Sequence, residues 1–146
     1  IRTRWPAVRI VLRGDSGFCR DDLMSWCEAS GVLYLFGIAR NNRLVKRITR
    51  ELKKVRRRYY EQRQAQRIYK DFTYRTLNSW SRRRRVIGKA EYLQKGENPR
   101  FVVTNLGREE IAAQELYEEV YCARGEMENR IKEQQLYLSP TGPPRP

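Results

Sequence analysis

The stretch VRIVLRGDSGFCRDDLMSWCEASGVLYLFGIA, residues 8–39, decides the fold class. It opens with an apolar run over residues 8–12 and closes with a second over residues 32–39, and both are typical of strands buried on two faces. Residues 21–30 between them are predicted to form a short helix that stops at Gly31. A strand, a crossover helix and a second strand make a βαβ unit, which predicts parallel strands in an α/β fold.

The first predicted strand runs directly into an acidic residue between two glycines. Asp15 lies between Gly14 and Gly17, where an α/β sheet places its functional residues. The glycines leave room for a metal ion or a phosphate to approach the backbone. Taken alone, the pattern favours an ordinary turn over a site. Asp21 and Asp22 are predicted to cap the following helix.

The net charge of the chain indicates which kind of partner it binds. The 146-residue chain is long enough for one domain with a core, and it holds 31 Lys and Arg against 17 Asp and Glu, a formal charge of +14. Such an excess favours a polyanionic partner, first of all nucleic acid. A membrane surface is less favoured, because the basic residues are not confined to one amphipathic helix. An inert basic surface is the remaining alternative.

Cysteine and histidine usage excludes several kinds of site. The chain has three cysteines in no CxxC pattern, and it has no histidine, which excludes His-based triads and the usual zinc sites. No apolar run approaches the roughly 20 residues of a membrane span, and no signal peptide opens the chain. These features predict a cytoplasmic protein with reduced cysteines and no membrane partner.

The rest of the chain alternates between helical and strand-like patterns. Residues 43–67 are predicted to form one long helix with an apolar stripe and a basic outer face. Residues 68–106 contain three β-rich runs separated by polar or Gly/Pro breaks, which predict antiparallel strands. Residues 109–138 form the longest helical pattern. Residues 139–146 are rich in proline and are predicted to be a disordered tail.

Three polar side chains that could form a site share one face of the late helix. Tyr121, Arg124 and Glu128 follow the spacing i, i+3, i+7, beside the apolar face of the predicted helix. Charged groups directed partly inward are costly unless they pair with something. The residues are therefore either a site or a buried structural pair between Arg124 and Glu128.

The segment RGDSGF together with Tyr121-x2-Arg124-x3-Glu128 resembles bacterial insertion-sequence transposases of the DDE type. The helix signature of that family continues six residues later with a lysine. Here the position is Gln135, and Lys132, one turn from Glu128, is the candidate to replace it. The resemblance covers roughly residues 8–138.

The resemblance implies a partial ribonuclease-H-like catalytic core in an α/β fold. Residues 1–67 and 107–138 would form the core, with parallel βαβ and long helices, and residues 68–106 would be an antiparallel β-rich insertion subdomain. The implied partners are transposon ends and target DNA, with a possible homo-oligomer in the transposition complex. The implied location is the bacterial cytoplasm.

The resemblance also implies metal-dependent DNA cleavage and strand transfer. Asp15 and Glu128 would hold two Mg²⁺ or Mn²⁺ ions, and carboxylates suit these hard cations. Arg124 and Tyr121 would contact the phosphate near the cut, and Lys132 would serve in place of the family lysine.

One catalytic acid of the family has no counterpart in the printed chain. The family needs a further Asp on an upstream strand, and none of the fourteen residues before Asp15 is acidic. We therefore expect a fragment that is inactive alone. Two alternatives stay open: a non-catalytic basic nucleic-acid-binding module, and a structural domain whose Arg124–Glu128 pair is a core ion pair.

Basic runs beside aromatic residues are the predicted DNA contacts, because they suit phosphate binding combined with base stacking. A solvated surface is the alternative for each run. Four consecutive arginines place positive charge on both faces of a strand, so one of those faces is expected to meet DNA or solvent. The predicted contacts are Arg56, Arg57, Arg58, Trp80, Arg82, Arg83, Arg84 and Arg85.

Overall fold

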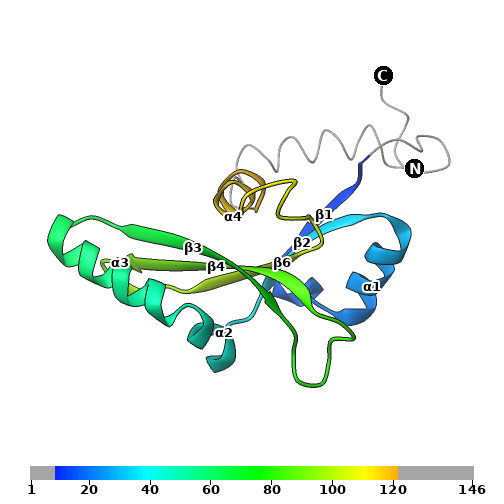
Figure 1. Ribbon diagram of the computed structural model, residues 1–146, viewed down its shortest axis with the longest axis horizontal. Helices are drawn as coiled ribbons and strands as arrows, with labels where there is room; N and C mark the ends of the chain where they lie inside the picture. Colours follow the sequence, from blue (N-terminus) through cyan, green and yellow to red (C-terminus); the bar gives the residue numbers. More distant parts are fainter. Residues whose placement is uncertain (1–8, 122–146) are drawn as a thin grey trace.

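The computed structural model describes residues 9–121 as a mixed α/β structure built on one six-stranded sheet (Figure 1). The strand order is β1-β2-β6-β4-β3, with the two-residue β5 paired to β4. β1 and β2 are parallel, and the other described pairs are antiparallel. The strands are β1 (Val11–Gly14), β2 (Leu33–Ile38), β3 (Gln66–Tyr74), β4 (Arg84–Leu93), β5 (Gly96–Glu97) and β6 (Arg100–Thr104).

The predicted βαβ unit is present. α1 (Asp21–Ser30) has the predicted bounds and ends at Gly31, whose φ of 67° is the left-handed conformation that glycine adopts without strain. β1 differs from the expectation of a strand buried on both faces, because it starts at Val11 and lies at the edge of the described sheet. Val11 is 44% exposed as a result.

The single long helix predicted over residues 43–67 is wrong. The segment forms α2 (Asn42–Arg47) and α3 (Thr49–Gln62), with a break at Ile48. The Thr49 hydroxyl donates to the carbonyl of Val45 at 3.3 Å, a back-bond that bends helices, and two β-branched residues stand together at the break. Arg63 then adopts φ 57° and ends α3, so β3 begins before residue 67.

The β-rich segment is antiparallel as predicted, and it extends the same sheet as the βαβ unit. β6 pairs with β2 from Leu35 opposite Thr104 to Ile38 opposite Phe101. β4 pairs on one side with β6 and on the other with β3. The predicted insertion is therefore joined to the predicted core by a ladder of backbone hydrogen bonds.

Helices cover both faces of the sheet (Figure 1). α1, α2 and α3 lie on one face, where Ile48 and Leu52 pack with Phe36 and Phe101 in the larger core cluster. Full burial of such an aliphatic side chain is worth about 1.5–3 kcal/mol. The other face is covered by α4 (Ala113–Glu115) and a π-helical segment, Leu116–Tyr121. The helix predicted over 109–138 starts later than predicted, at Ala113, because the residues before it form a turn in which the Glu110 amide donates to the Gly107 carbonyl at 3.0 Å. The rest of that predicted helix and the predicted tail, residues 139–146, lie outside the described residues.

Alternation along the strands explains the two-sided core. Successive side chains of a strand point to opposite faces. Phe36 belongs to the cluster beneath α2 and α3, and its neighbour Leu35 belongs to the cluster beneath α4. Leu116 and Tyr117 close that second cluster against Ile87.

Candidate functional site

Asp15 is held at the carboxyl end of β1 by a tight turn. Its carboxylate accepts a hydrogen bond from the Gly17 amide at 2.9 Å and caps the 3₁₀ turn Ser16–Phe18. The Phe18 ring packs directly over Gly14, where a Cβ would meet it at 2.5 Å. The side chain of Asp15 is exposed, and a carboxylate has acceptor capacity beyond one such bond. The turn therefore presents an oriented acid to solvent.

A cavity of about 440 Å³ joins Asp15 to the start of the late helix. Asp15 and Ser16 line it from one side, and Tyr117 and Tyr121 line it from another. Arg13 of β1 ties these sides together, because its guanidinium donates to the Val120 carbonyl at 3.3 Å. Two residues that the sequence predicted as functional, Asp15 and Tyr121, thus line the same cavity.

Gly37 makes room for Tyr121 at this cavity. Gly37 lies in β2, and a Cβ there would come within 2.7 Å of the Tyr121 hydroxyl oxygen. The same Cβ would lie 3.7 Å from the backbone carbonyl carbon of Asp15. Sequence reasoning missed this position, although a glycine inside an apolar strand is a signal of close approach.

Three basic residues also line the cavity, and sequence reasoning missed these as well. Arg40 follows β2, Arg100 begins β6, and Lys89 lies opposite Arg100 in β4. Lys89 pairs with Glu91 at 3.4 Å and lies 5.0 Å from the Tyr117 ring centroid, whereas Arg40 and Arg100 are exposed. Parallel β2 ends where antiparallel β6 begins, so the topology brings these cations beside Asp15. Cations in this arrangement suit a phosphate group.

The described lining does not by itself form a metal site. Among residues 9–121 no group of three His, Cys, Asp or Glu side chains could hold a metal ion. Asp15 is the one carboxylate that lines the described part of the cavity. The other predicted residues of the late helix, Arg124, Glu128 and Lys132, lie outside the described residues.

The structure places two of the predicted DNA contacts in the interior. Trp80 is 4% exposed and packs against Tyr74, with ring centroids 5.7 Å apart. The Arg84 side chain is 2% exposed and donates to Glu28 at 2.8 Å and to Asp21 at 2.9 Å. Neither side chain has an open face for a base or a phosphate. This differs from the expectation, because Arg84 pairs with acids of α1 that lie far away in the sequence.

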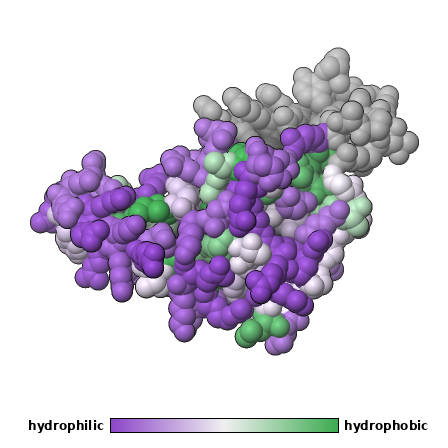
Figure 2. Space-filling view, viewed as in Figure 1, coloured by the Kyte–Doolittle hydropathy of each residue, from purple (hydrophilic) through white to green (hydrophobic). Residues whose placement is uncertain are grey.

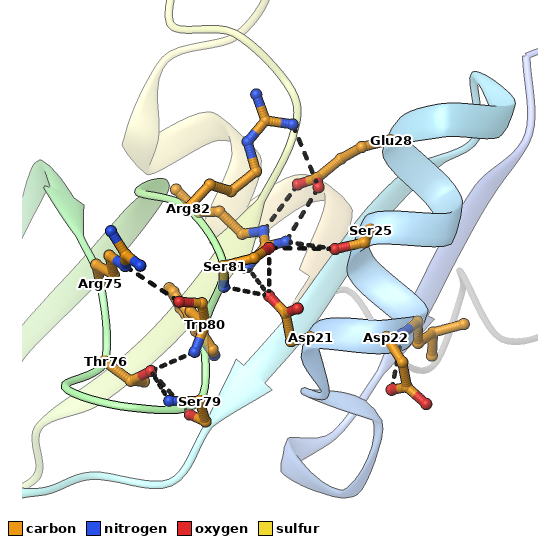
Figure 3. A network of polar contacts seen from close by, with 12 residues as sticks. Asp21, Asp22, Ser25, Glu28, Arg75, Thr76, Ser79, Trp80, Ser81 and Arg82 are labelled. Atoms are coloured by element: carbon orange, nitrogen blue, oxygen red, sulfur yellow. Dashed lines mark hydrogen bonds and ion pairs between the residues drawn. The ribbon is translucent and has the colours of Figure 1, made fainter.

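The hydrogen bonds between Arg84 and the acids of α1 explain why Asp21 does not cap this helix. Its carboxylate accepts hydrogen bonds from the Ser81 backbone and from Arg84, across the space between α1 and the loop before β4 (Figure 3). These bonds lower the pKa of Asp21. Burial alone would raise the pKa of Glu28, but hydrogen bonds from Arg84 and Tyr34 outweigh burial and hold it below its usual range.

The remaining predicted DNA contacts differ in how far their side chains are exposed. Arg85 is largely buried and pairs with Asp71 at 2.6 Å. Arg82 contacts Glu28 at 3.5 Å but is 61% exposed (Figure 3). The others are exposed: Arg56, Arg57, Arg58 and Arg83.

No helix in the described part of the chain combines the length and the apolar character that crossing a bilayer requires. The face of the molecule drawn in Figure 2 is mostly hydrophilic.

Comparison with known proteins identifies the family. The chain matches the family model described as transposase DDE domain group 1 over residues 1–142, nearly its whole length. Comparisons with curated proteins and with solved structures gave no match. The family match confirms the resemblance read from RGDSGF and the late-helix signature. Because this match spans nearly the whole chain, the chain belongs to the transposase DDE domain group 1 family.

Proposed function

We propose that this chain is part of the catalytic domain of a transposase that cleaves DNA and joins it to a new site. Its sheet would be part of a ribonuclease-H-like core, and the parallel pair β1–β2 with an acid at its carboxyl end supports this. The implied partners are transposon ends and target DNA, bound by a possible homo-oligomer.

One observation carries the proposal. Asp15 and Tyr121 belong to two family motifs that are widely separated in the sequence, and they line one cavity of about 440 Å³. That cavity also contains Arg40, Lys89 and Arg100, so cations outnumber the single described acid. A phosphodiester is the group of DNA that such a mixture suits, because guanidinium groups bind phosphate oxygens in pairs.

The described residues have distinct roles in this proposal. Arg40 and Arg100 bind phosphate oxygens, and the Tyr121 hydroxyl orients the phosphate beside Asp15. DDE transposases generally use divalent metal ions, and Asp15 would supply one oxygen ligand. Glu128 as a second ligand, with Arg124 and Lys132 as phosphate contacts, stays a prediction for the late helix.

Mn²⁺ titration followed by NMR tests the role of Asp15. The paramagnetic ion should broaden the amide signals of Ser16, Gly37 and Tyr121 first, because these residues line the cavity around Asp15. Asp15→Asn should abolish the broadening. The matched control is Asp22→Asn, which removes a carboxylate that is 77% exposed on α1. Unchanged broadening in Asp15→Asn would contradict a metal-binding role.

A second candidate function is non-catalytic nucleic-acid binding. It is favoured by the net charge of +14 and by the lack of a three-ligand metal cluster among residues 9–121. We propose that the 146-residue chain alone binds DNA without cutting it. A supercoiled plasmid with Mg²⁺ or Mn²⁺ should therefore show no more nicking than with Asp15→Asn. Nicking that depends on Asp15 would overturn the proposed inactivity.

A further inference from the structure

Positive charge is concentrated in one short part of the chain. Residues 43–63, which span α2, α3 and the residue after α3, contain ten Lys or Arg and two Glu. This surplus of eight is more than half of the net charge of +14. A concentration of this kind creates a local potential that attracts a polyanion.

Helical spacing gathers four of these cations on the outer face of α3. Arg50, Lys53, Lys54 and Arg57 follow the pattern i, i+3, i+4, i+7, and all four are exposed. We call these four residues the basic stripe. At a rise of 1.5 Å per residue, the stripe is about 10 Å long. Leu52 and Val55 are buried on the opposite side of the helix against the sheet.

The cations of the basic stripe are available for a ligand. None of the four side chains makes a hydrogen bond or an ion pair with any residue of the described chain. By contrast, Arg47 on α2 is engaged, because its guanidinium donates to the Thr73 carbonyl at 3.2 Å. The nearby acid Glu51 is directed to Lys70 at 3.9 Å and is 16% exposed.

The chemistry of this surface favours nucleic acid over a membrane or a protein. A helix that lies on a membrane inserts apolar side chains between lipids, and the buried apolar residues of α3 face the sheet instead. Protein interfaces have apolar or aromatic anchors at their centre, and the basic stripe has none. Hydrophilic residues cover most of the surface around α3 in Figure 2.

The basic stripe is separate from the cavity, because none of its four residues lines the cavity. α3 packs on the face of the sheet that contains Phe36, whereas Tyr117, which lines the cavity, packs on the opposite face beneath α4. Figure 1 shows α3 and α4 on opposite sides of the sheet. We propose that the basic stripe binds the phosphate backbone of a DNA duplex segment other than the segment whose phosphate enters the cavity. This inference rests on the proposed function, in which the chain acts on DNA.

Salt-dependent binding to a short labelled duplex of arbitrary sequence tests the inference with the full chain. Each phosphate contact contributes about −0.9 to the slope of log affinity against log salt. Lys54→Gln/Arg57→Gln should therefore make the slope shallower by about 1.8. The matched control Arg20→Gln/Lys95→Gln also removes one Arg and one Lys, both exposed, and should keep the wild-type slope.

A third variant separates this inference from the proposed function. Arg40→Gln/Arg100→Gln removes the exposed cations of the cavity and leaves the basic stripe intact. If the stripe variant behaves like its control while the cavity variant weakens binding, the stripe inference is overturned and the cavity proposal stands. If the wild-type chain binds vesicles of phosphatidylcholine and phosphatidylserine through the stripe but binds no duplex, both proposals fail. A slope that is shallower in the stripe variant than in its control supports the inference, whether or not the cavity variant also weakens binding.

Discussion

At the scale of single residues, Gly37 sets how closely the late helix approaches Asp15. The Tyr121 hydroxyl occupies the space that a β-carbon at position 37 would need. A β-carbon at position 37 would therefore force the Tyr121 hydroxyl to shift. The glycine is therefore as much a part of the site as the side chains that line it.

Gly37→Ala should destabilise the protein by about 1–3 kcal/mol, the usual range for overpacking. In a Tyr121→Phe background the same substitution should be less costly, because the hydroxyl that meets the new methyl group is gone. Urea denaturation of the four proteins in this double-mutant cycle gives the coupling free energy, expected to be at least 0.5 kcal/mol. Additive effects would show that the two groups are not in contact.

Arg84 contributes to stability through its buried contacts with α1. Arg84→Gln should lower the free energy of unfolding by about 3 kcal/mol, because two acids would lose their buried partner. Arg82→Gln is the control, since that side chain is 61% exposed and a surface change of this kind is worth about 0.5 kcal/mol or less. Equal effects of the two substitutions in urea denaturation would contradict the role of Arg84.

The same contacts predict a pH dependence of stability. The folded-state pKa values of Asp21 and Glu28 lie below their ordinary values of 3.8 and 4.5. Between the folded-state pKa values and these ordinary values, the unfolded chain binds more protons than the folded chain. The stabilisation is therefore fully present above the ordinary pKa values, and it is lost as pH falls through the folded-state pKa values. Unfolding free energies measured from neutral to acid pH should fall less steeply in Arg84→Gln than in the wild type. Parallel curves would contradict this linkage.

At the scale of elements, α2 begins at a capping side chain next to the cavity. The Asn41 side chain accepts a hydrogen bond from the Leu44 amide at 2.9 Å. This cap fixes the direction in which the chain leaves Arg40, a cavity residue, and enters the helical layer.

Asn41→Ala should destabilise the protein by about 1 kcal/mol, because an amide at the helix start would lose its partner. Asn41→Asp preserves an acceptor at the same place and should restore most of the stability. The neighbouring Asn42→Ala is the control. Thermal unfolding of the three variants checks the expectation, which fails if the two alanine variants have the same melting temperature.

Local patterns predicted the elements well where one pattern dominated. The bounds of α1, the stop at Gly31 and the parallel pair β1–β2 follow from residues close together in the sequence. The break at Ile48 escaped prediction because Leu44, Ile48 and Leu52 keep helical spacing across it, and all three are buried. Spacing predicts which residues face the core, whereas the break itself lies in the non-helical backbone of Ile48, with φ −120° and ψ 20°.

The candidate site could be predicted only for its motif residues. Asp15 and Tyr121 were predicted because they belong to short patterns with a chemical meaning. Arg40, Lys89 and Arg100 could not be found in this way, because the pairing of β2 with β6 and of β6 with β4 brings them together. The burial of Arg84 could not be predicted for the same reason. The acids that pair with it, Asp21 and Glu28, come from α1, far from Arg84 in the sequence.

At the scale of the whole molecule, the charge of +14 acts on the folded state itself. Like charges on a compact chain repel each other, and this repulsion opposes folding. Salt screens it over a distance of about 8 Å at physiological ionic strength.

The melting temperature should therefore rise when NaCl is added to a low-salt buffer. Lys54→Gln/Arg57→Gln removes two charges from the most basic region and should show a smaller rise than the wild type. Differential scanning fluorimetry over a salt series provides the measurement. A melting temperature that is flat or falls with salt would show that ion pairs such as Arg84 with Glu28 outweigh the overall repulsion.

The ladder between β2 and β6 limits how this chain can vary in evolution. Residues 66–104 cannot be lost as a cassette, because their removal would uncover four paired residues of β2 and the packing surface of α3. Changes in length are tolerated where backbone is exposed and outside the ladder. We therefore expect relatives to differ in length at the exposed loop residues 77–79 and at the turn 94–95, while the strands between them keep their register.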